Sequence, residues 1–408
     1  MQRHISCEPQ KKIMPEPVDL TILMPCLNEA ETLARCIEKA KAGIQKSGVR
    51  GEILVADNGS TDGSQAIAEK LGARVAAIPE KGYGNALIGG TSTAAGKWIL
   101  MGDADDSYDF SEADRFVKKF QEGYDLVMGC RLPSGGGTIL PGAMPWKNRW
   151  IGNPVLTFIG RFFFKCPAHD FHCGLRGYTK ESFESMDLQT TGMEFATEMV
   201  IKATLRKLKV TEVPVTLSKD GRSRPPHLKP WRDGWRHLRF MLLFSPRWLF
   251  LIPGFVLFVL GADVSIALSI RDIQIGTVML NVGTLAVSCM IAIVGFQLVA
   301  FAFFTKVFAI AEGLLPEDPK LTNVLKLFTL EKGILVSIAV FLAGIILLGR
   351  AMWLWSQVHF GQLPSMEDNL RRLIPAAALV VLGIQGIFSS FFMSALGLKT
   401  KTRKPPAV

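Results

Sequence analysis

The chain has 408 residues, of which 49% are hydrophobic and 20% are charged, and its formal net charge is +10. This composition excludes an intrinsically disordered chain, which would be poorer in apolar residues and richer in charge. Collagen, coiled-coil and disulfide-scaffold proteins are excluded too, because no glycine or heptad period persists and seven cysteines are few for this length. Residues 1–245 are mixed and charged, whereas residues 248–398 are mostly apolar, so we expect at least two domains.

The first 17 residues are polar and contain Lys11 and Lys12, without the apolar stretch of a secretory signal peptide. We expect them to form a flexible N-terminal segment. We also expect the domain that follows, at residues 18–224, to stay on the cytoplasmic side of a membrane.

Residues 18–224 alternate short apolar runs with segments in which apolar residues recur at helical spacing. The apolar runs predict strands at 19–25, 51–56, 74–78, 96–101, 124–129 and 210–217. The helical spacing predicts helices at 28–43, 64–71, 83–95, 110–122 and 192–207. This alternation is typical of an α/β domain with a mostly parallel sheet, which binds ligands at the carboxyl ends of its strands.

Acidic residues follow three of the predicted strands. Glu29 follows the first strand, Asp57 follows the second, and Asp103 and Asp105 follow the fourth. For the polar residues at 60–62 the alternative is a local role in capping the next helix. Carboxylates gathered at one sheet edge repel one another unless a cation lies between them. Oxygen ligands of this kind favour Mg²⁺ or Mn²⁺ that bridges to phosphates.

Six motifs occur in a fixed order along the chain. They are P-C-L-N-E at 25–29, D-N-G-S-T-D at 57–62, K-G-Y-G-N-A at 81–86, G-D-A-D-D at 102–106, G-C-R at 129–131 and D-F-H-C-G-L-R at 170–176. The chain thereby resembles the family 2 glycosyltransferases of GT-A (Rossmann-like) fold, specifically the dolichol-phosphate or polyprenyl-phosphate sugar transferases. The resemblance covers about residues 18–245. Asn58 departs from it, because the family has a second acid there, and Ser107 stands where the family often has Gln.

The resemblance implies a UDP- or GDP-linked sugar as donor and a bound Mg²⁺ or Mn²⁺. Asp103 and Asp105 would line the pyrophosphate and hold the metal. The donor-binding residues that it implies are Pro25, Leu27, Asn28, Glu29, Asp57, Asn58, Gly84, Asp103, Ala104 and Asp105. The metal would stabilise charge on the leaving nucleotide diphosphate while an acceptor oxygen attacks the sugar from the opposite face. A single displacement of this kind inverts the anomeric centre.

A polyprenyl (undecaprenyl-type) phosphate acceptor carries an oxygen that is already ionised, so it needs no strong base. We expect cationic and hydroxyl groups to bind that phosphate instead. The residues chosen for this role are Arg131, Arg149, Arg176, Arg222 and Ser223, and the catalytic residues are Asp105, Asp170 and Arg131. Asp170 could be a base, an orienter of the acceptor site or a helix cap. The alternatives are local carboxylate partners for Arg131 and Arg149, and a solvated linker at 221–224. Glu194 and Glu198 are expected on a solvated helix face.

Two other functions stay open from the sequence. A glycosyltransferase acting on a neutral lipid hydroxyl, such as a ceramide or diacylglycerol, would need a base, and Asp170 is the candidate. A lipid-linked-sugar transporter with a regulatory GT-A domain is the second alternative, although four spans are few for a transporter.

Two further signals are weak. Cys166, His169, His172 and Cys173 suggest zinc, but their spacing matches no familiar finger. Arg149 and the Trp that follows it resemble the end of Q-x-x-R-W in polymerising synthases. The position three residues before Arg149 is Trp rather than Gln, which disfavours processive synthesis.

Residues 225–247 carry an amphipathic pattern, because Trp231, Trp235, Leu238 and Leu242 recur at helical spacing while arginines lie off that stripe. This predicts a helix in the membrane interface with its tryptophans at headgroup depth. The alternative is an ordinary surface helix packed on the soluble domain.

Four apolar stretches are long enough to cross a bilayer. They lie at 248–270, within 273–305, at 333–355 and at 373–398. We therefore expect a four-helix transmembrane domain at 248–398, followed by a basic cytoplasmic tail at 399–408. Asp263 within the first span has no assigned role.

Basic residues flank the first and last spans, which predicts that both ends are cytoplasmic. The positive net charge is then explained by a cytoplasmic face that lies against anionic lipid. A nucleic-acid partner is not needed to explain this charge. We expect an integral, multi-pass protein of the inner (plasma) membrane of a bacterium. The sequence leaves open whether it forms a homo-oligomer.

Overall fold

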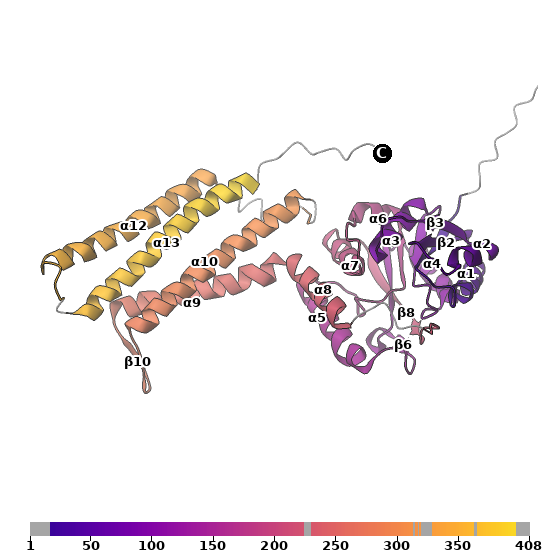
Figure 1. Cartoon of the computed structure of the whole chain (residues 1–408), viewed down its shortest axis with the longest axis horizontal. Coiled ribbons are helices and arrows are strands. Elements are labelled where there is room, and N and C mark those ends of the chain that lie inside the picture. Colours follow the sequence, from indigo (N-terminus) through magenta and orange to yellow (C-terminus); the bar gives the residue numbers. More distant parts are fainter. Residues whose placement is uncertain are drawn as a thin grey trace, which may run out of the picture. The chain divides into compact units, whose positions relative to one another are not determined.

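The computed structural model describes residues 17–223, 230–312, 315–316, 318–319, 329–362 and 365–396. The chain divides into two units, Met1–Phe240 and Met241–Val408 (Figure 1), and their boundary falls inside the predicted interfacial segment at 225–247. Residues 1–16 of the predicted N-terminal segment and the predicted basic tail at 399–408 lie outside the described residues.

The first unit is built on a seven-stranded sheet with the order β3-β2-β1-β4-β7-β5-β8. Its strands are β1 (Leu20–Cys26), β2 (Gly51–Asp57), β3 (Arg74–Ala77), β4 (Trp98–Met101), β5 (Leu126–Cys130), β7 (Arg176–Thr179) and β8 (Val210–Pro214). Only β7 is antiparallel to its neighbours β4 and β5; the other pairs are parallel. The predicted mostly parallel α/β domain is confirmed.

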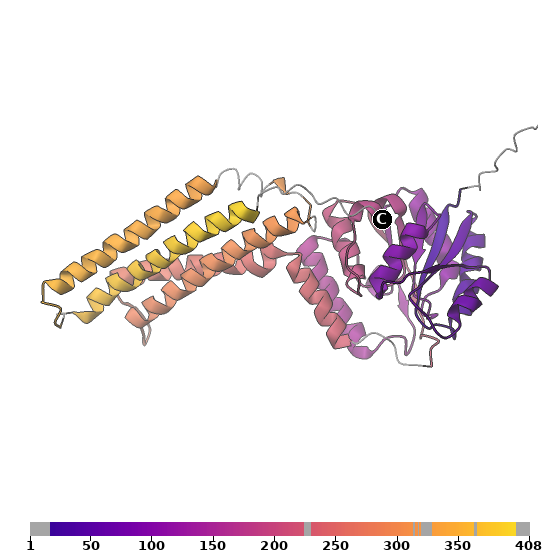
Figure 2. The same ribbon diagram turned by 45° about the horizontal axis from the view of Figure 1, so that its top comes forward.

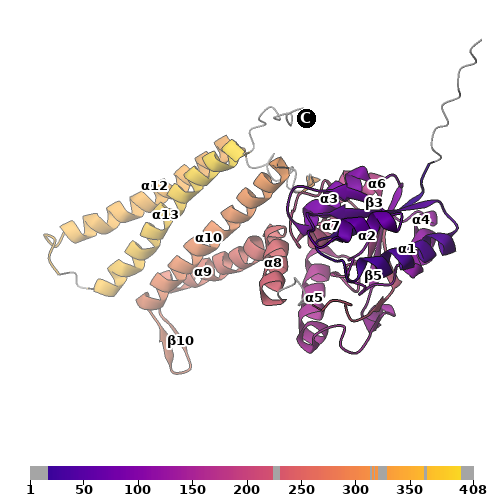
Figure 3. The same cartoon turned by 45° about the vertical axis from the view of Figure 1, so that its right-hand side comes forward.

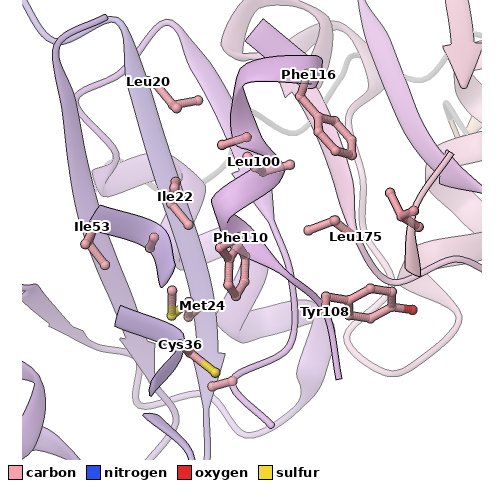
Figure 4. Close-up of a cluster of buried hydrophobic side chains, with 14 of the residues drawn as sticks. Leu20, Ile22, Met24, Cys36, Ile53, Leu100, Tyr108, Phe110, Phe116 and Leu175 are labelled. Carbon is pink, nitrogen blue, oxygen red and sulfur yellow. The ribbon is translucent and has the colours of Figure 1, made fainter. Parts of the chain in front are cut away.

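Helices cover both faces of this sheet. They are α1 (Leu33–Ser47), α2 (Ser64–Lys70), α3 (Tyr83–Thr93), α4 (Ala113–Gln121), α5 (Asn153–Phe164), α6 (Lys180–Met186) and α7 (Phe195–Leu205). Side chains at alternate positions of β1 point to opposite faces of the sheet. Leu20, Ile22 and Met24 share a buried cluster with side chains of α1 and α4 (Figure 4). Leu23 faces α3 instead, where its side chain lies against Gly90. The continuous apolar run of β1 thus reflects burial on both faces.

Several elements differ from the sequence expectation. The predicted strand at 210–217 is broken, because its end leaves the sheet as β9 (Thr216–Leu217) and pairs with β6 (Thr138–Ile139). The predicted helix at 28–43 begins only at Leu33, after a loop in which Asn28 adopts a left-handed backbone. Elements α5, α6 and β7 were not predicted from the sequence.

Helix α8 (Pro230–Leu243) occupies part of the predicted interfacial segment. Asp233 on this helix is buried, and His237 bonds the hydroxyl of Thr197 on α7 over 2.7 Å. Trp235 is 59% exposed. One side of α8 therefore packs on the first unit, as in the surface-helix alternative, while a tryptophan on another side is open.

The described residues of the second unit contain four helices that are long and apolar enough to cross a membrane. They are α9 (Ile252–Ile270), which extends a helical segment starting at Arg247, α10 (Val282–Ala311), α12 (Leu330–Ser356) and α13 (Met366–Leu396). They run side by side in Figure 2. A hairpin of β10 (Ile273–Ile275) and β11 (Val278–Leu280) joins α9 to α10 and is visible in Figure 3. The four predicted spans are confirmed, with the second beginning after this hairpin.

Small residues let the long helices approach closely. A Cβ on Gly295 of α10 would lie 2.3 Å from the backbone nitrogen of Phe258 on α9. A Cβ on Gly383 of α13 would lie 2.6 Å from the backbone of Phe341 on α12. Such close backbone packing is typical of helices that associate in lipid, where apolar burial gives little driving force.

Candidate functional site

The three predicted acidic loops meet at one edge of the sheet. Strands β1, β2 and β4 are adjacent and parallel, so their carboxyl ends lie together. Burial and the charge of Asp105 raise the pKa of Asp103 well above its usual value, and Glu29 adds to this effect. The Tyr83 hydroxyl is hydrogen-bonded to Asp103. We call the carboxylates of Glu29, Asp103 and Asp105 the acidic edge.

Asp105 is held in place by Ser107, which stands where the resembled family often has Gln. Its Oδ1 accepts hydrogen bonds from the backbone nitrogen of Ser107 at 3.0 Å and from the Ser107 hydroxyl at 2.6 Å. Its Oδ2 lies 3.3 Å from a guanidinium nitrogen of Arg222. Ser107 therefore orients one oxygen of Asp105 and leaves the other directed at a cation.

The carboxylates of Asp103 and Asp105 are chemically suited to a divalent cation, since both offer hard oxygen ligands in a crowded acidic setting. Within the described residues, no group of three or more His, Cys, Asp or Glu side chains is arranged to hold a metal ion. The chain therefore fits a cation that is shared with phosphate oxygens and water, rather than one enclosed by protein ligands alone.

The loops after β1 and β2 interlock through several of the predicted donor-binding residues. The side-chain oxygen of Asn28 accepts from the backbone nitrogen of Thr61 at 2.8 Å. Asp57 accepts from the backbone of Ser60 and from the side chain of Gln65 at 2.6 Å. Burial raises the pKa of Asp57, but these hydrogen bonds outweigh it, so the pKa lies below its usual value. The two loops form one rigid rim.

The hydrogen bonds of Asn58 explain why an amide stands at a position where the sequence comparison predicts an acid. Its Nδ2 donates to the carbonyl oxygens of Ile78 at 3.0 Å and Glu80 at 2.7 Å. Its Oδ1 accepts from the backbone nitrogen of Gly82 at 2.8 Å. A carboxylate could not make the two donated bonds. Asn58 thus fastens the segment before α3 to the end of β2.

The other predicted donor-binding residues lie in β1, in the loops after β1 and β4, and in α3. Pro25 lies in β1 and Leu27 is 37% exposed just beyond it. Ala104 is buried, and its carbonyl accepts from the hydroxyl of Thr32 at 2.6 Å. Gly84 requires a glycine, because a Cβ there would lie 2.1 Å from the carbonyl oxygen of Thr190.

The basic segment at 221–223 lies across the acidic edge. Arg222 donates two hydrogen bonds to Glu29, at 2.9 and 2.8 Å, in addition to its contact with Asp105. Ser223 bonds Glu31 through its backbone nitrogen and its hydroxyl. A cavity of about 360 Å³ opens here, lined by Asn28, Glu29, Glu31, Thr61, Asp62 and Arg222. This segment is a structured cover of the edge, and not the solvated linker of the alternative.

Arg131 and Asp170 form a buried pair. The Asp170 carboxylate accepts from Nε of Arg131 at 2.7 Å, from its Nη2 at 2.8 Å and from its backbone nitrogen at 3.0 Å. Asp170 is 0% exposed, and Glu212 bonds its backbone nitrogen. Burial raises the pKa of Asp170, but the charge of Arg131 and the hydrogen bonds to the carboxylate together outweigh burial, and the pKa lies below its usual value. Asp170 therefore lacks the access and basicity that a general base needs.

Arg176 does not fit the predicted role of phosphate ligand. It is 0% exposed, and its guanidinium donates to the carbonyl oxygens of Cys173 at 2.6 Å, Phe171 at 3.1 Å and Ala196. Because these donors are committed to backbone oxygens inside the domain, Arg176 supports the 171–173 loop. This placement corrects the expectation that Arg176 contacts the acceptor.

Glu198 also differs from expectation, because it is 1% exposed rather than solvated. It pairs with Lys202 at 2.9 Å and accepts from the backbone nitrogen and hydroxyl of Thr190. It thereby holds the loop against which Gly84 packs. Its partner in the prediction, Glu194, is only part-buried and lies 3.8 Å from Arg236.

A second and larger cavity adjoins the Arg131–Asp170 pair. It has a volume of about 740 Å³ and is lined by apolar side chains together with two arginines. Its lining includes Leu132 and His169, the chain neighbours of the pair, and Arg149, Trp150, Phe158 and Arg161 from the segment leading into and along α5. We call this space the aromatic pocket. The sequence pointed to Arg149 but missed Arg161 and the aromatic walls, because α5 was not predicted.

Known proteins match both units of the chain. Residues 21–186 match Glycosyl transferase family 2, and residues 303–397 match the Glycosyltransferase family 2 C-terminal transmembrane region. The chain is 36% identical over 380 residues to the low-salt glycan biosynthesis hexosyltransferase Agl6 of Haloferax volcanii. The aligned region covers 93% of this chain and 89% of that protein. The chain belongs to glycosyltransferase family 2. The resemblance seen in its motifs and the predicted enzyme class are confirmed.

Other similar proteins cover the first unit of this glycosyltransferase. A dolichyl-phosphate hexose transferase of Haloferax volcanii is 29% identical over 199 residues, 48% of this chain and 82% of that protein. Glucosyl-3-phosphoglycerate synthase of Mycobacterium tuberculosis, solved with Mn²⁺, UDP and glucosyl-3-phosphoglycerate, has a TM-score of 0.43 at 19% identity and covers 55% of this chain and 78% of that one. With four spans and the matched transmembrane region, the glycosyltransferase is an integral membrane protein.

The cysteines and histidines between 166 and 173 of the glycosyltransferase have separate surroundings. His169 bonds Glu212 at 2.7 Å, whereas His172 lies 4.8 Å from the ring of His237. Cys173 is buried beside Tyr108. Within the part of the chain that the structure describes, these side chains are not arranged to hold a metal ion.

Proposed function

We propose that the enzyme transfers one sugar from a UDP- or GDP-linked donor to a polyprenyl or dolichyl phosphate in the cytoplasmic leaflet, with inversion and with Mg²⁺ or Mn²⁺. The observation that carries the proposal is the aromatic pocket, which combines two arginines with aromatic walls beside the Arg131–Asp170 pair. Such a lining matches an acceptor with an anionic head and an apolar chain. The name of the dolichyl-phosphate hexose transferase relative supports the same class of acceptor.

The acidic edge is the donor half of the proposed site. Asp103 and Asp105 would hold the cation on the diphosphate, and the bound metal would supply positive charge to the leaving group. The interlocked loops carrying Asn28 and Asp57 would bind the nucleoside. Arg222 lies over the edge and would contact the diphosphate once the donor separates it from Glu29 and Asp105.

The aromatic pocket is the acceptor half. Arg149 and Arg161 line it, and we assign to them the acceptor phosphate, since guanidinium groups match phosphate oxygens in geometry and charge. Arg131 is committed to Asp170 through its backbone nitrogen, Nε and Nη2. We therefore assign the pair to shaping the wall between the two halves, with Nη1 of Arg131 donating to the hydroxyl of Tyr108 at 3.5 Å.

The reaction then needs no base from the chain. An ionised acceptor oxygen attacks the anomeric carbon, a new carbon–oxygen bond forms, and the bond to the nucleotide diphosphate breaks with its electron pair. A neutral lipid hydroxyl would instead lose a proton to a base. Asp170 is the sequence candidate for that base, and its burial and pairing weigh against this alternative.

The test is product identification. The purified full chain with Mn²⁺ or Mg²⁺ is incubated with UDP- and GDP-sugars and with undecaprenyl or dolichyl phosphate, and the lipid fraction is analysed by mass spectrometry. A lipid-phosphate monosaccharide is expected with the wild type and with the control Asp109→Asn, which lies outside the acidic edge. Asp105→Asn should reduce it by at least two orders of magnitude. Absence of the product with every donor would overturn the proposal.

A further inference from the structure

Two of the long apolar helices each carry an exposed charge within their apolar length. Helix α9 packs on α10, α10 on α13 and α13 on α12, so α10 and α13 lie between α9 and α12 (Figures 1 and 3). Asp263 is exposed on α9, and Arg350 is exposed on α12. Among the residues that the structure describes, neither side chain forms a salt bridge or a hydrogen bond.

The two charges lie at a similar depth on the same side of the bilayer. Successive spans cross in opposite directions, so α9 and α12, the first and third spans, run the same way. At 1.5 Å per residue, Asp263 lies about 7 Å and Arg350 about 10 Å beyond the middle of its span. The apolar core extends roughly 15 Å from the middle of a bilayer, so both charges lie within it. An unpaired charge at this depth is costly, and such residues are usually paired with an opposite charge.

The surroundings of the two charges are alike, because exposed apolar side chains accompany each of them at helical spacing. Those near Asp263 are Val256, Leu260 and Val264, which are 48%, 57% and 36% exposed, and those near Arg350 are Leu342, Ile346 and Trp353, which are 49%, 69% and 59% exposed. Each helix therefore presents an apolar stripe that contains one charge, and the two stripes carry charges of opposite sign.

We propose that α9 of one copy of the chain packs against α12 of a second copy in the membrane, and that Asp263 pairs with Arg350 across this contact. A contact between two α9 helices would oppose two carboxylates, and one between two α12 helices would oppose two guanidinium groups. A lipid phosphate would satisfy Arg350 but repel Asp263. A second copy satisfies both charges, and the long arginine side chain spans their small difference in depth.

Disulfide cross-linking of the full chain in liposomes tests the contact independently of the transfer reaction. Leu260→Cys lies one turn from Asp263 on α9, and Ile346→Cys lies one turn from Arg350 on α12. The two single-cysteine variants carry tags of different size, are reconstituted together at low density and are oxidised with copper phenanthroline. The chain without an added cysteine is the control for the native cysteines.

The expected product joins position 260 of one copy to position 346 of another, in a yield several-fold above the 260–260 and 346–346 products. No cross-link above the control would overturn the proposal. Products that join like positions in equal or greater yield would show a different interface, which would overturn it as well. This part of the test keeps both charges, so it does not depend on whether a charge variant folds.

Reversing the charges tests the ion pair itself. Asp263→Arg should lower the 260–346 yield several-fold, because two guanidinium groups would then meet, and adding Arg350→Asp should restore it. The matched control adds Arg372→Asp instead, which changes an exposed arginine on α13 and should not restore the yield. An unchanged yield with Asp263→Arg, or equal rescue by the two second changes, would overturn the pairing of Asp263 with Arg350.

Discussion

Removing one partner of the Arg131–Asp170 pair should destabilise the catalytic unit strongly. In Asp170→Asn, the amide nitrogen would face one of the N–H groups that now donate to the carboxylate. The guanidinium of Arg131 would also stay buried without its counter-charge. Breaking a buried ion pair in this way costs about 3–5 kcal/mol. For a unit of this size the melting temperature should fall by about 6–20 °C.

The assay is thermal unfolding of the purified chain, followed by tryptophan fluorescence. The control is Glu122→Gln, which removes an exposed ion pair with Lys119 and should change stability by less than about 1 kcal/mol. Arg131→Met combined with Asp170→Leu removes both charges and leaves chiefly one backbone N–H unsatisfied. Its cost is about 1–3 kcal/mol, so the double variant should melt above Asp170→Asn.

The same pair predicts a direction for the pH dependence of stability. Because the folded pKa of Asp170 lies below its unfolded value, the stabilisation is present above the unfolded pKa of about 3.9 and is lost as pH falls through the folded value. It should therefore be constant between about pH 6 and 8. A melting temperature of Asp170→Asn within about 2 °C of wild type at neutral pH would refute the buried pair.

Three other changes test separate parts of the structure. Arg222→Gln removes a cation 3.3 Å from Asp105 and should tighten Mn²⁺ binding without donor by about tenfold in calorimetry; equal or weaker binding would contradict that contact. Asn58→Asp loses two donated bonds and should lower stability by about 1–3 kcal/mol in chemical denaturation, and an unchanged midpoint would show the amide is dispensable. Gly295→Leu should disrupt α9–α10 packing and yield aggregated protein in size-exclusion chromatography, unlike Gly349→Leu, where a Cβ meets nothing within 4 Å.

Local pattern was sufficient to predict six of the seven strands of the sheet and the acidic edge. Continuous apolar runs identify β1 and β2 because these strands are buried on both faces, and parallel pairing then brings Asp57 and Asp105 to one edge without further information. The four spans were predictable for a similar reason, since a bilayer demands long apolar segments whatever the tertiary structure.

Tertiary partners could not be predicted in this way. Arg131 and Asp170 are 39 residues apart, and no periodicity relates them. Glu194 and Glu198 are four residues apart and were expected on a solvated helix face, yet the fold buries Glu198 against Lys202. Helix α5 was missed because Gly152, Pro154 and Gly160 interrupt its pattern, and its outward aromatics contradict the rule that apolar side chains face a protein core.

Two acceptors that differ only in the phosphate distinguish a lipid phosphate from a lipid alcohol as the substrate of this enzyme. The wild-type chain is given each nucleotide sugar in turn with dolichyl phosphate or with dolichol of the same chain length, and the rate of glycolipid formation is measured. We expect glycosylation of the phosphate at a rate at least a hundredfold above that of the alcohol, and a higher acceptor KM in Arg149→Ala and Arg161→Ala. Equal or faster glycosylation of the alcohol would contradict the proposed acceptor.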